Sequence, residues 1–230
     1  MRTGLGVIDL PRQRSKAAVR DKWRLKKWYN IVSPEVFGRI PIGMTPADEK
    51  EKLYKRTIEV TLFDITGDYS HVNTKLKFQV VDVIENNAYT VFKGHEILRD
   101  YLRSLTRRRS SKISTIINAV TKDNAKIRVT IATFTQYRCK TSQKKVVRKI
   151  MKDIIEKKSA QLTFDEFVRS AVFSENEDSL ASEVAKAVKK ICSIRKVEII
   201  KQKVIEIPSV VKERKEIEKS QQIEEQGVVS

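Results

Sequence analysis

The spacing of apolar residues changes along the chain from the period of a strand to the period of a helix. Alternating apolar and polar residues predict six strands, in the segments RTIEVTLFDITGD, KLKFQVVDV, AYTVFKG, SKISTIINAV, AKIRVTIATFTQY and VEIIKQKVIEI. In the second segment the apolar residues change parity near Val80, which predicts a β-bulge. The sequence TKDN between the fourth and fifth segments is typical of a hairpin turn.

Apolar residues three and four positions apart predict amphipathic helices, mostly in the last third of the chain. These helices are expected in HEILRDYLRSL, TSQKKVVRKIMKDIIEKK, TFDEFVRSAVF and residues 180–191. Thr163 and Glu166 have the spacing of a capping box, and Thr45 followed by Pro46 predicts a further helix start. Because strands come first and helices later, we expect an α+β fold with a largely antiparallel sheet or partial barrel and flanking amphipathic helices.

Length and composition predict one folded domain with two extensions. The chain has 230 residues, of which 40% are hydrophobic, and we expect a flexible basic arm over 1–20, a single domain over 21–207 and a mobile charged tail over 208–230. No run approaches the roughly 20 apolar residues of a spanning helix, and the first residues lack the apolar region of a secretory signal. The two cysteines, Cys139 and Cys192, are too few for a disulfide framework and indicate a reducing compartment.

The net charge of +18 is concentrated in two windows of the sequence. Residues 1–30 contain nine Lys and Arg and two Asp, and residues 107–149 contain thirteen Lys and Arg and one Asp, so the rest of the chain is close to neutral. Clustered positive charge is typical of a surface that binds a polyanion, either nucleic acid or an acidic membrane. The alternative is a solvated face that only favours solubility.

Three basic segments are the candidates for phosphate binding. Residues 21–29 interleave cations with two Trp and one Tyr, residues 107–112 contain three consecutive Arg, and residues 137–149 lead into a predicted helix. Arg side chains can hold phosphates in a bidentate way, although one or two of them could instead complement a helix dipole. The candidate RNA-binding residues are Lys22, Arg24, Lys26, Lys27, Trp28, Tyr29, Arg107, Arg108, Arg109, Lys112, Arg138, Lys140, Lys144, Lys145, Arg148 and Lys149.

Lys144 and Lys145 break a local rule. They fall in the first turn of a helix expected to be capped near Thr141, where acidic residues are usual because the helix dipole is positive there. Such a pattern indicates that an anion binds at this end. The rings of Trp23 and Trp28 could stack on unpaired bases, but we expect them to anchor the arm on the core while the neighbouring cations contact RNA.

Signatures of enzymes and of metal sites are weak. No phosphate-binding Gly-rich loop is present, and His95-Glu96 is not followed by the second His of a zinc protease motif. Asp64, Asp68 and Asp82 could form a nuclease-like carboxylate group, and the ligand types His71, His95, Cys139 and Cys192 lack metal-site spacing. We therefore expect a protein that is not an enzyme and needs no cofactor or metal.

Several long motifs of the chain occur in the order of a known family. They are DKWRLKKWY, IGMTPADE, RTIEVTLFDITGDYS, KLKFQV, FKGHEILRDYLRSLTRRRSSKI, YRCKTSQKKVVRKIMKDIIEKK and RKVEIIKQKV. Over residues 21–207 the chain resembles the small-ribosomal-subunit protein family of the S-three-a type, most of all its archaeal (S-three-A-e) branch. It departs from that pattern at Cys192 and Ser193, where archaeal relatives often have an aromatic residue and a proline.

The resemblance implies a structural protein of the small ribosomal subunit in the cytoplasm of an archaeon. It implies binding to small-subunit rRNA on the platform near the mRNA exit, beside other platform proteins and within reach of mRNA, with no membrane partner. The alternative is a nucleic-acid-binding or translation-regulatory protein that acts off the ribosome. The family has no established single-residue site, so only the role of the three basic segments is carried over.

Overall fold

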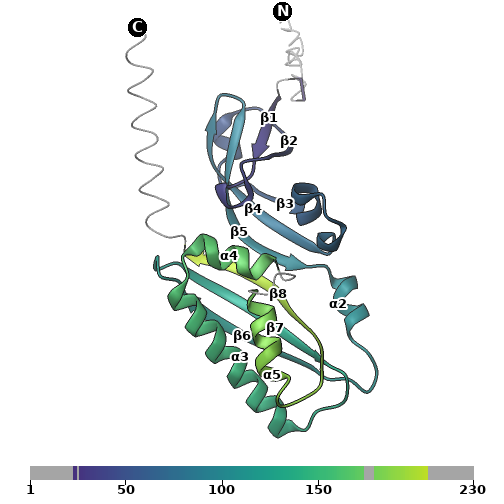
Figure 1. The fold of residues 1–230 in the computed structure, drawn as a ribbon. Helices are drawn as coiled ribbons and strands as arrows, with labels where there is room; N and C mark the ends of the chain where they lie inside the picture. Colours follow the sequence, from purple (N-terminus) through teal and green to yellow (C-terminus); the bar gives the residue numbers. More distant parts are fainter. Residues whose placement is uncertain (1–22, 25, 174–178, 207–230) are drawn as a thin grey trace, which may run out of the picture.

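Eight strands form one open, mixed sheet with helices on it (Figure 1). The computed structural model describes residues 23–24, 26–173 and 179–206, so the predicted arm, the predicted tail and Lys22 lie outside the described residues. The strand order is β2-β1-β5-β8-β7-β6, and β4 pairs with the other edge of β5 and with β3. The predicted α+β class is confirmed.

Five strands make the first half of the sheet, and β5 is their centre. The start of β5 pairs with β1 in parallel, while its other edge pairs with β4 in antiparallel orientation. The strands are β1 (Lys27–Val32), β2 (Pro41–Ala47), β3 (Thr57–Thr61), β4 (Thr74–Ile84) and β5 (Asn87–Ile97). The short helices between them are η1 (Glu35–Phe37), η2 (Lys50–Leu53), α1 (Leu62–Thr66) and η3 (Tyr69–His71).

The second half is a three-stranded antiparallel sheet with helices on one face (Figure 1). α2 (Arg99–Leu105) leads from β5 into the hairpin of β6 (Lys112–Val120) and β7 (Lys126–Thr135). The remaining elements are α3 (Thr141–Gln161), α4 (Phe164–Val172), α5 (Leu180–Val188) and β8 (Ile194–Glu206).

The two halves are joined where β5 crosses β8. Gly94, His95 and Glu96 pair with Lys203, Gln202 and Lys201. At this crossing only glycine fits, because a Cβ at position 94 would lie 2.1 Å from the carbonyl oxygen of Gln202. His95 is buried beside it, with Nδ1 3.1 Å from Gln202 Oε1 and Nε2 3.1 Å from the carbonyl oxygen of Ile199. Burial lowers the pKa of His95, so the ring stays neutral and acts as a structural link.

The main core lies between the sheet and the helices. The inward side chains of β6 and β7 pack against the stripe of Val147, Met151 and Ile155 on α3, as the helical periodicity predicts. The same core cluster contains Phe78 and Phe92 from the first half, so it is continuous across the joint. A smaller cluster beneath the β1–β2 end contains Tyr29, Ala47, Leu53, Val80, Val83 and Ala88.

Local expectations are confirmed at most elements and wrong at three. The strand expected over RTIEVTLFDITGD ends at Thr61, because Leu62–Thr66 form α1, whose capping box joins Thr61 and Asp64. The bulge near Val80 is present as a register shift between Val80 and Asp82. Thr45 does not begin a helix, because it pairs with Tyr29 in the β1–β2 ladder and the short helix η2 starts only at Lys50. The helix expected from His95 begins at Arg99, because pairing with β4 keeps β5 extended as far as Ile97.

Candidate nucleic-acid interface

The second and third basic segments of the sequence meet in the fold. Buried Ser111 joins them, because its hydroxyl accepts a hydrogen bond from the backbone N–H of Cys139 at 3.2 Å. Its own backbone N–H donates to Thr135 Oγ1 at 2.9 Å, and its carbonyl accepts from the Thr135 N–H. These bonds fix the start of β6 against the approach to α3. We call the combined surface the basic pole, which consists of Arg107, Arg108, Arg109, Lys112, Arg138, Lys140, Lys144, Lys145, Arg148 and Lys149.

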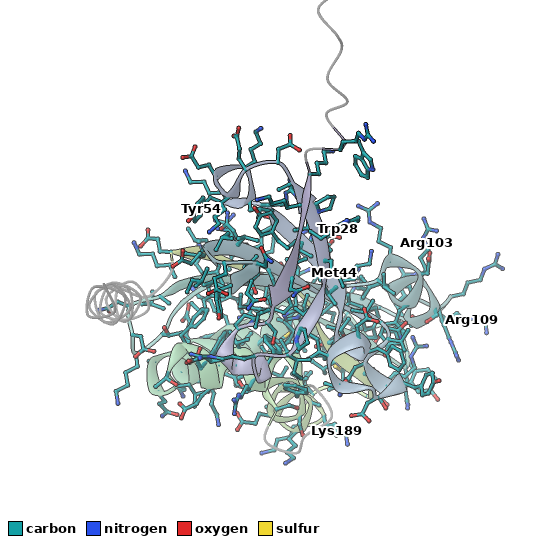
Figure 2. The ribbon with its side chains drawn as sticks, turned by 90° about the horizontal axis from the view of Figure 1, so that it is seen from above. Trp28, Met44, Tyr54, Arg103, Arg109 and Lys189 are labelled. Carbon is teal, nitrogen blue, oxygen red and sulfur yellow. The ribbon has the colours of Figure 1, made fainter. Side chains whose placement is uncertain are left out.

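A tight turn presents the three consecutive arginines. The Ser110 hydroxyl donates to the carbonyl of Arg107 at 2.6 Å and accepts from its N–H at 3.3 Å, which closes the turn. Arg109 has a φ of 62°, a left-handed conformation that costs an L-residue about 1 kcal/mol or more. All three arginines are exposed, and the Arg109 side chain extends away from the body of the protein (Figure 2). The turn thus holds cations in solvent rather than on a core or on a helix end.

The N-terminus of α3 adds free backbone donors to these cations. The helix is capped at Lys140, one residue before the expected Thr141, and the side chain of Gln143 accepts from the Lys140 N–H at 3.0 Å. The first intrahelical bond runs from Lys144 N–H to Lys140 oxygen, and no acid lies in the first turn. The N–H groups ahead of that bond are therefore directed out of the helix end, where they favour an anion. Lys144 and Lys145 follow directly, at the junction of the first and second turns rather than within the first turn as expected, because the cap lies at Lys140.

The cations of the basic pole lack acidic partners within the part of the chain that the structure describes. No ion pair involves any of the ten residues there; Lys112 lies 5.9 Å from the Phe134 ring centre, and Arg148 Nε donates to the Ser114 carbonyl on the edge strand β6. By contrast, ion pairs form elsewhere, for example between Lys77 and Glu59 and between Lys201 and Glu96. The pole therefore combines dense positive charge with nothing in the described residues to neutralise it.

The first basic segment lies at the other end of the molecule, on β1 and just before it (Figure 1). Here the expectation that the Trp rings anchor the arm is wrong, since Trp23 and Trp28 are 61% and 59% exposed. The buried ring is that of Tyr29, which is 3% exposed and belongs to the smaller core cluster. Tyr29 is therefore the anchor and cannot contact RNA through its ring, which corrects its assignment as an RNA-binding residue. Arg24 and Lys27 are exposed, as expected for phosphate contacts.

Two of the three candidate nuclease acids, Asp64 and Asp82, have structural partners. Asp64 closes the capping box of α1, accepting from the N–H of Thr61 at 3.1 Å, and Asp82 accepts from the N–H of Val83 at 2.9 Å. Among the residues that the structure describes, no group of three or more His, Cys, Asp and Glu side chains could hold a metal ion. The carboxylate group that the nuclease alternative needs is thus not assembled in this part of the chain.

Two features of the structure were missed in the sequence. Cys139 and Cys192 are far apart in the chain, yet their thiols interact. Burial, and to a smaller extent the neighbouring Cys139, raise the pKa of the Cys192 thiol to about 11.

The second feature is a set of cations on the sheet face opposite the helices. Lys126, Arg128 and Lys203 lie there, on strands that pair with each other. The alternation in AKIRVTI does place Lys126 and Arg128 on the face opposite the buried isoleucines, so a signal for these two cations existed.

Comparison with known proteins gives matches over most of the chain. The model of the Ribosomal S3Ae family matches residues 14–208. The small ribosomal subunit protein eS1 of Aeropyrum pernix is 52% identical over 193 residues, which cover 84% of this chain and 90% of the relative. The proteins of the same name from Staphylothermus marinus and Ignicoccus hospitalis are 52% and 49% identical over 196 and 198 residues, each covering 85% of this chain and 91% and 92% of the relative. No helix within the described ranges is long and apolar enough to cross a membrane.

Proposed function

The chain belongs to the Ribosomal S3Ae family, a family of structural rather than catalytic ribosomal proteins, and we propose that it binds small-subunit rRNA through the basic pole. This membership confirms the resemblance that the sequence motifs indicated. The finer proposal is a position on the platform of cytoplasmic small subunits near the mRNA exit, beside other platform proteins and within reach of mRNA. The observation that supports rRNA binding is the convergence of two basic segments on one surface whose cations have no acidic partner among the described residues.

The proposed mechanism is neutralisation of phosphates by a preorganised surface. Duplex RNA is recognised mainly through its shape, its phosphates and its 2′-hydroxyls, because its major groove is too narrow for side chains. Hydrogen bonds between a serine hydroxyl and the backbone fix both parts of the surface: Ser110 fixes the turn of Arg107, Arg108 and Arg109, and Ser111 fixes the approach to α3. Little ordering of the backbone is then needed on binding, and the released counterions supply much of the free energy.

The salt dependence of binding tests which cations face phosphates. We expect each Arg→Ala change at Arg107, Arg108 and Arg109 to lower the slope of log affinity against log salt by about 1. The matched control is Lys77→Ala with Lys201→Ala, because both lysines already pair with carboxylates and should leave the slope nearly unchanged. The measurement is filter binding to small-subunit rRNA at several salt concentrations. If the variant with all three arginines changed to Ala shows the same slope of log affinity against log salt as the parent protein, the basic pole does not bind phosphates.

Sedimentation tests whether the bound RNA is that of the ribosome. We expect the full-length protein to migrate with small subunits in a sucrose gradient at moderate salt. A pool that binds RNA but remains at the top of the gradient would instead favour a regulatory protein acting off the ribosome.

A further inference from the structure

We propose that Trp28 and Met44 form a stacking platform for an unpaired RNA base, at the end of the molecule opposite the basic pole. This inference rests on the proposed function and deepens it, because it names single-stranded rather than duplex RNA as the form bound at this end. Ordinary stability does not require the platform, since Tyr29 already supplies the aromatic anchor of β1.

The strand register places the two apolar side chains on one face. Trp28 is opposite Pro46 in the β1–β2 ladder, and Asn30 is opposite Met44, so Trp28 and Met44 are diagonal neighbours on the side of the ladder away from Tyr29. Trp28 is 59% exposed and Met44 is 66% exposed. Figure 2 shows both side chains over this ladder. A Trp ring beside Met and Pro is a flat apolar surface, and large exposed apolar groups of this kind mark interaction sites.

The charge around the platform favours RNA as the partner. Exposed Arg24 and Lys27 precede Trp28 in sequence, and neither forms an ion pair with any described residue. Lys26, two residues before Trp28, is a third cation, and its Nζ lies 4.1 Å from the centre of the Trp23 ring. Aromatic rings that stack on bases, next to cations that hold the backbone, are the usual means of binding single-stranded nucleic acid. A neutral protein surface would have to desolvate these cations without compensation.

The edge strand argues against a protein partner that adds a strand. β2 is the last strand on this side of the sheet, and such an edge is a template for another chain. Pro41 and Pro46 lie in β2, and each lacks a backbone N–H. With its donors reduced, β2 is poorly suited to extend the sheet into a neighbouring protein, whereas stacking of a base on Trp28 needs no backbone donor.

Intrinsic fluorescence gives a direct test, because the only two Trp residues of the chain are Trp23 and Trp28. In full-length protein carrying Trp23→Phe, all tryptophan emission comes from Trp28. We expect single-stranded oligoadenylate RNA to quench this emission strongly, whereas heparin, a polyanion without bases, binds and leaves it unquenched. Oligoadenylate that binds in a filter assay without quenching Trp28 would overturn the proposal.

Variants separate stacking from general charge binding. Trp28→Ala should weaken binding of oligoadenylate by about tenfold, and Trp28→Phe should retain most of the affinity because a smaller ring still stacks. The matched control is Tyr54→Ala, which removes an exposed aromatic side chain outside the platform and should change nothing. Suppose that Trp28→Ala binds oligoadenylate normally while the variant with Arg107, Arg108 and Arg109 all changed to Ala loses binding to small-subunit rRNA: the platform is then refuted and the proposed function stands. If neither variant loses binding to its RNA, both proposals fail. A blue shift of Trp28 emission in assembled small subunits without a photo-cross-link to RNA would assign this face to a protein neighbour.

Discussion

The basic pole and the charged strip on the open sheet face use the same kinds of residue in opposite ways. We define the strip as Glu59, Lys77, Glu96 and Lys201, one residue each from β3, β4, β5 and β8. Its charges neutralise one another, since Lys77 Nζ lies 2.7 Å from Glu59 Oε1 and 3.4 Å from Glu96 Oε2, and Lys201 Nζ lies 2.9 Å from the same Glu96 oxygen. At the pole, no such pair is found among the described residues.

This difference shows that a count of cations does not locate a binding surface. A cation that already pairs with a carboxylate contributes to the fold and has little charge left for an external phosphate. A cluster of cations without acidic partners repels itself, so it destabilises the isolated protein and is stabilised when a polyanion binds. The strip should therefore govern stability, and the pole should govern affinity for RNA.

The largest effect is expected from reversing charge at the pole. Lys144→Glu combined with Lys145→Glu should weaken binding to small-subunit rRNA by about 100-fold or more, because two charged contacts are lost and two repulsions replace them. The melting temperature should not fall, since acids near a helix N-terminus are favourable.

The matched control for this variant lies on the same helix. Lys152→Glu with Lys157→Glu makes the same change of charge farther along α3, at exposed positions, and should affect binding much less. Equal losses in the two double variants, measured by filter binding, would mean that net charge rather than the pole determines affinity.

A smaller effect is expected from the strip, and it should depend on pH. Although burial acts in the opposite direction, the hydrogen bond and charge of Lys201, together with Lys77, lower the pKa of Glu96 in the folded protein. Glu96 should therefore stabilise the fold by up to about 1 kcal/mol above its unfolded-state pKa, and lose this contribution as the pH falls through the lower folded-state pKa.

Thermal melts of Glu96→Gln measure that contribution. The parent protein should be more stable than the variant at pH 7, and the difference should vanish once the pH is below the folded-state pKa of Glu96, while the variant binds RNA normally. Glu51→Gln, an exposed change outside the strip, is the control. A stability difference that stays constant with pH would show that the ion pairs are not its source.

The smallest effect, and one of opposite sign, is expected at Arg109. Glycine adopts the left-handed conformation of this residue without strain, which favours the folded state of Arg109→Gly. Glycine also has greater conformational entropy in the unfolded state, which offsets part of this gain. The net result should be a free energy of unfolding higher by about 0.5 kcal/mol. The same variant should bind RNA more weakly. A gain in stability with a loss of binding, from chemical denaturation and filter binding, would indicate that the strained turn is maintained for function; a loss of both would place Arg109 among the residues that hold the fold.

The secondary structure was predictable wherever a pattern extended over many residues. The stripe of α3, the capping box of α4 and the alternation of β6 and β7 all appear as predicted. One error falls at Leu62, where a capping box starts α1 inside an expected strand. The other two fall at Thr45 and at His95, where the local signals for a helix start were sound. In both places strand pairing, with Tyr29 and with β4, outweighed them, because pairing across long sequence separations cannot be read from local spacing.

Burial of single aromatic residues was less predictable than charge. The sequence placed two Trp and one Tyr together but could not say which ring points inward. In a strand that choice depends on the register against β2, and a shift of one residue would exchange Tyr29 for Trp28. The interaction of Cys139 with Cys192 was equally invisible, because it depends on the packing of two loops 53 positions apart.

The sequence alone determined the α+β class, the family, most helices and strands, and the two windows that hold the excess positive charge, since each depends on residue type and spacing. The tertiary structure decided which of those cations lack partners, that residues 107–112 and 138–149 form one surface, and that Trp28 faces outward. The physical reason is that neutralisation and exposure depend on what the fold brings within a few ångströms. In this protein those neighbours come from strands and loops distant in the chain.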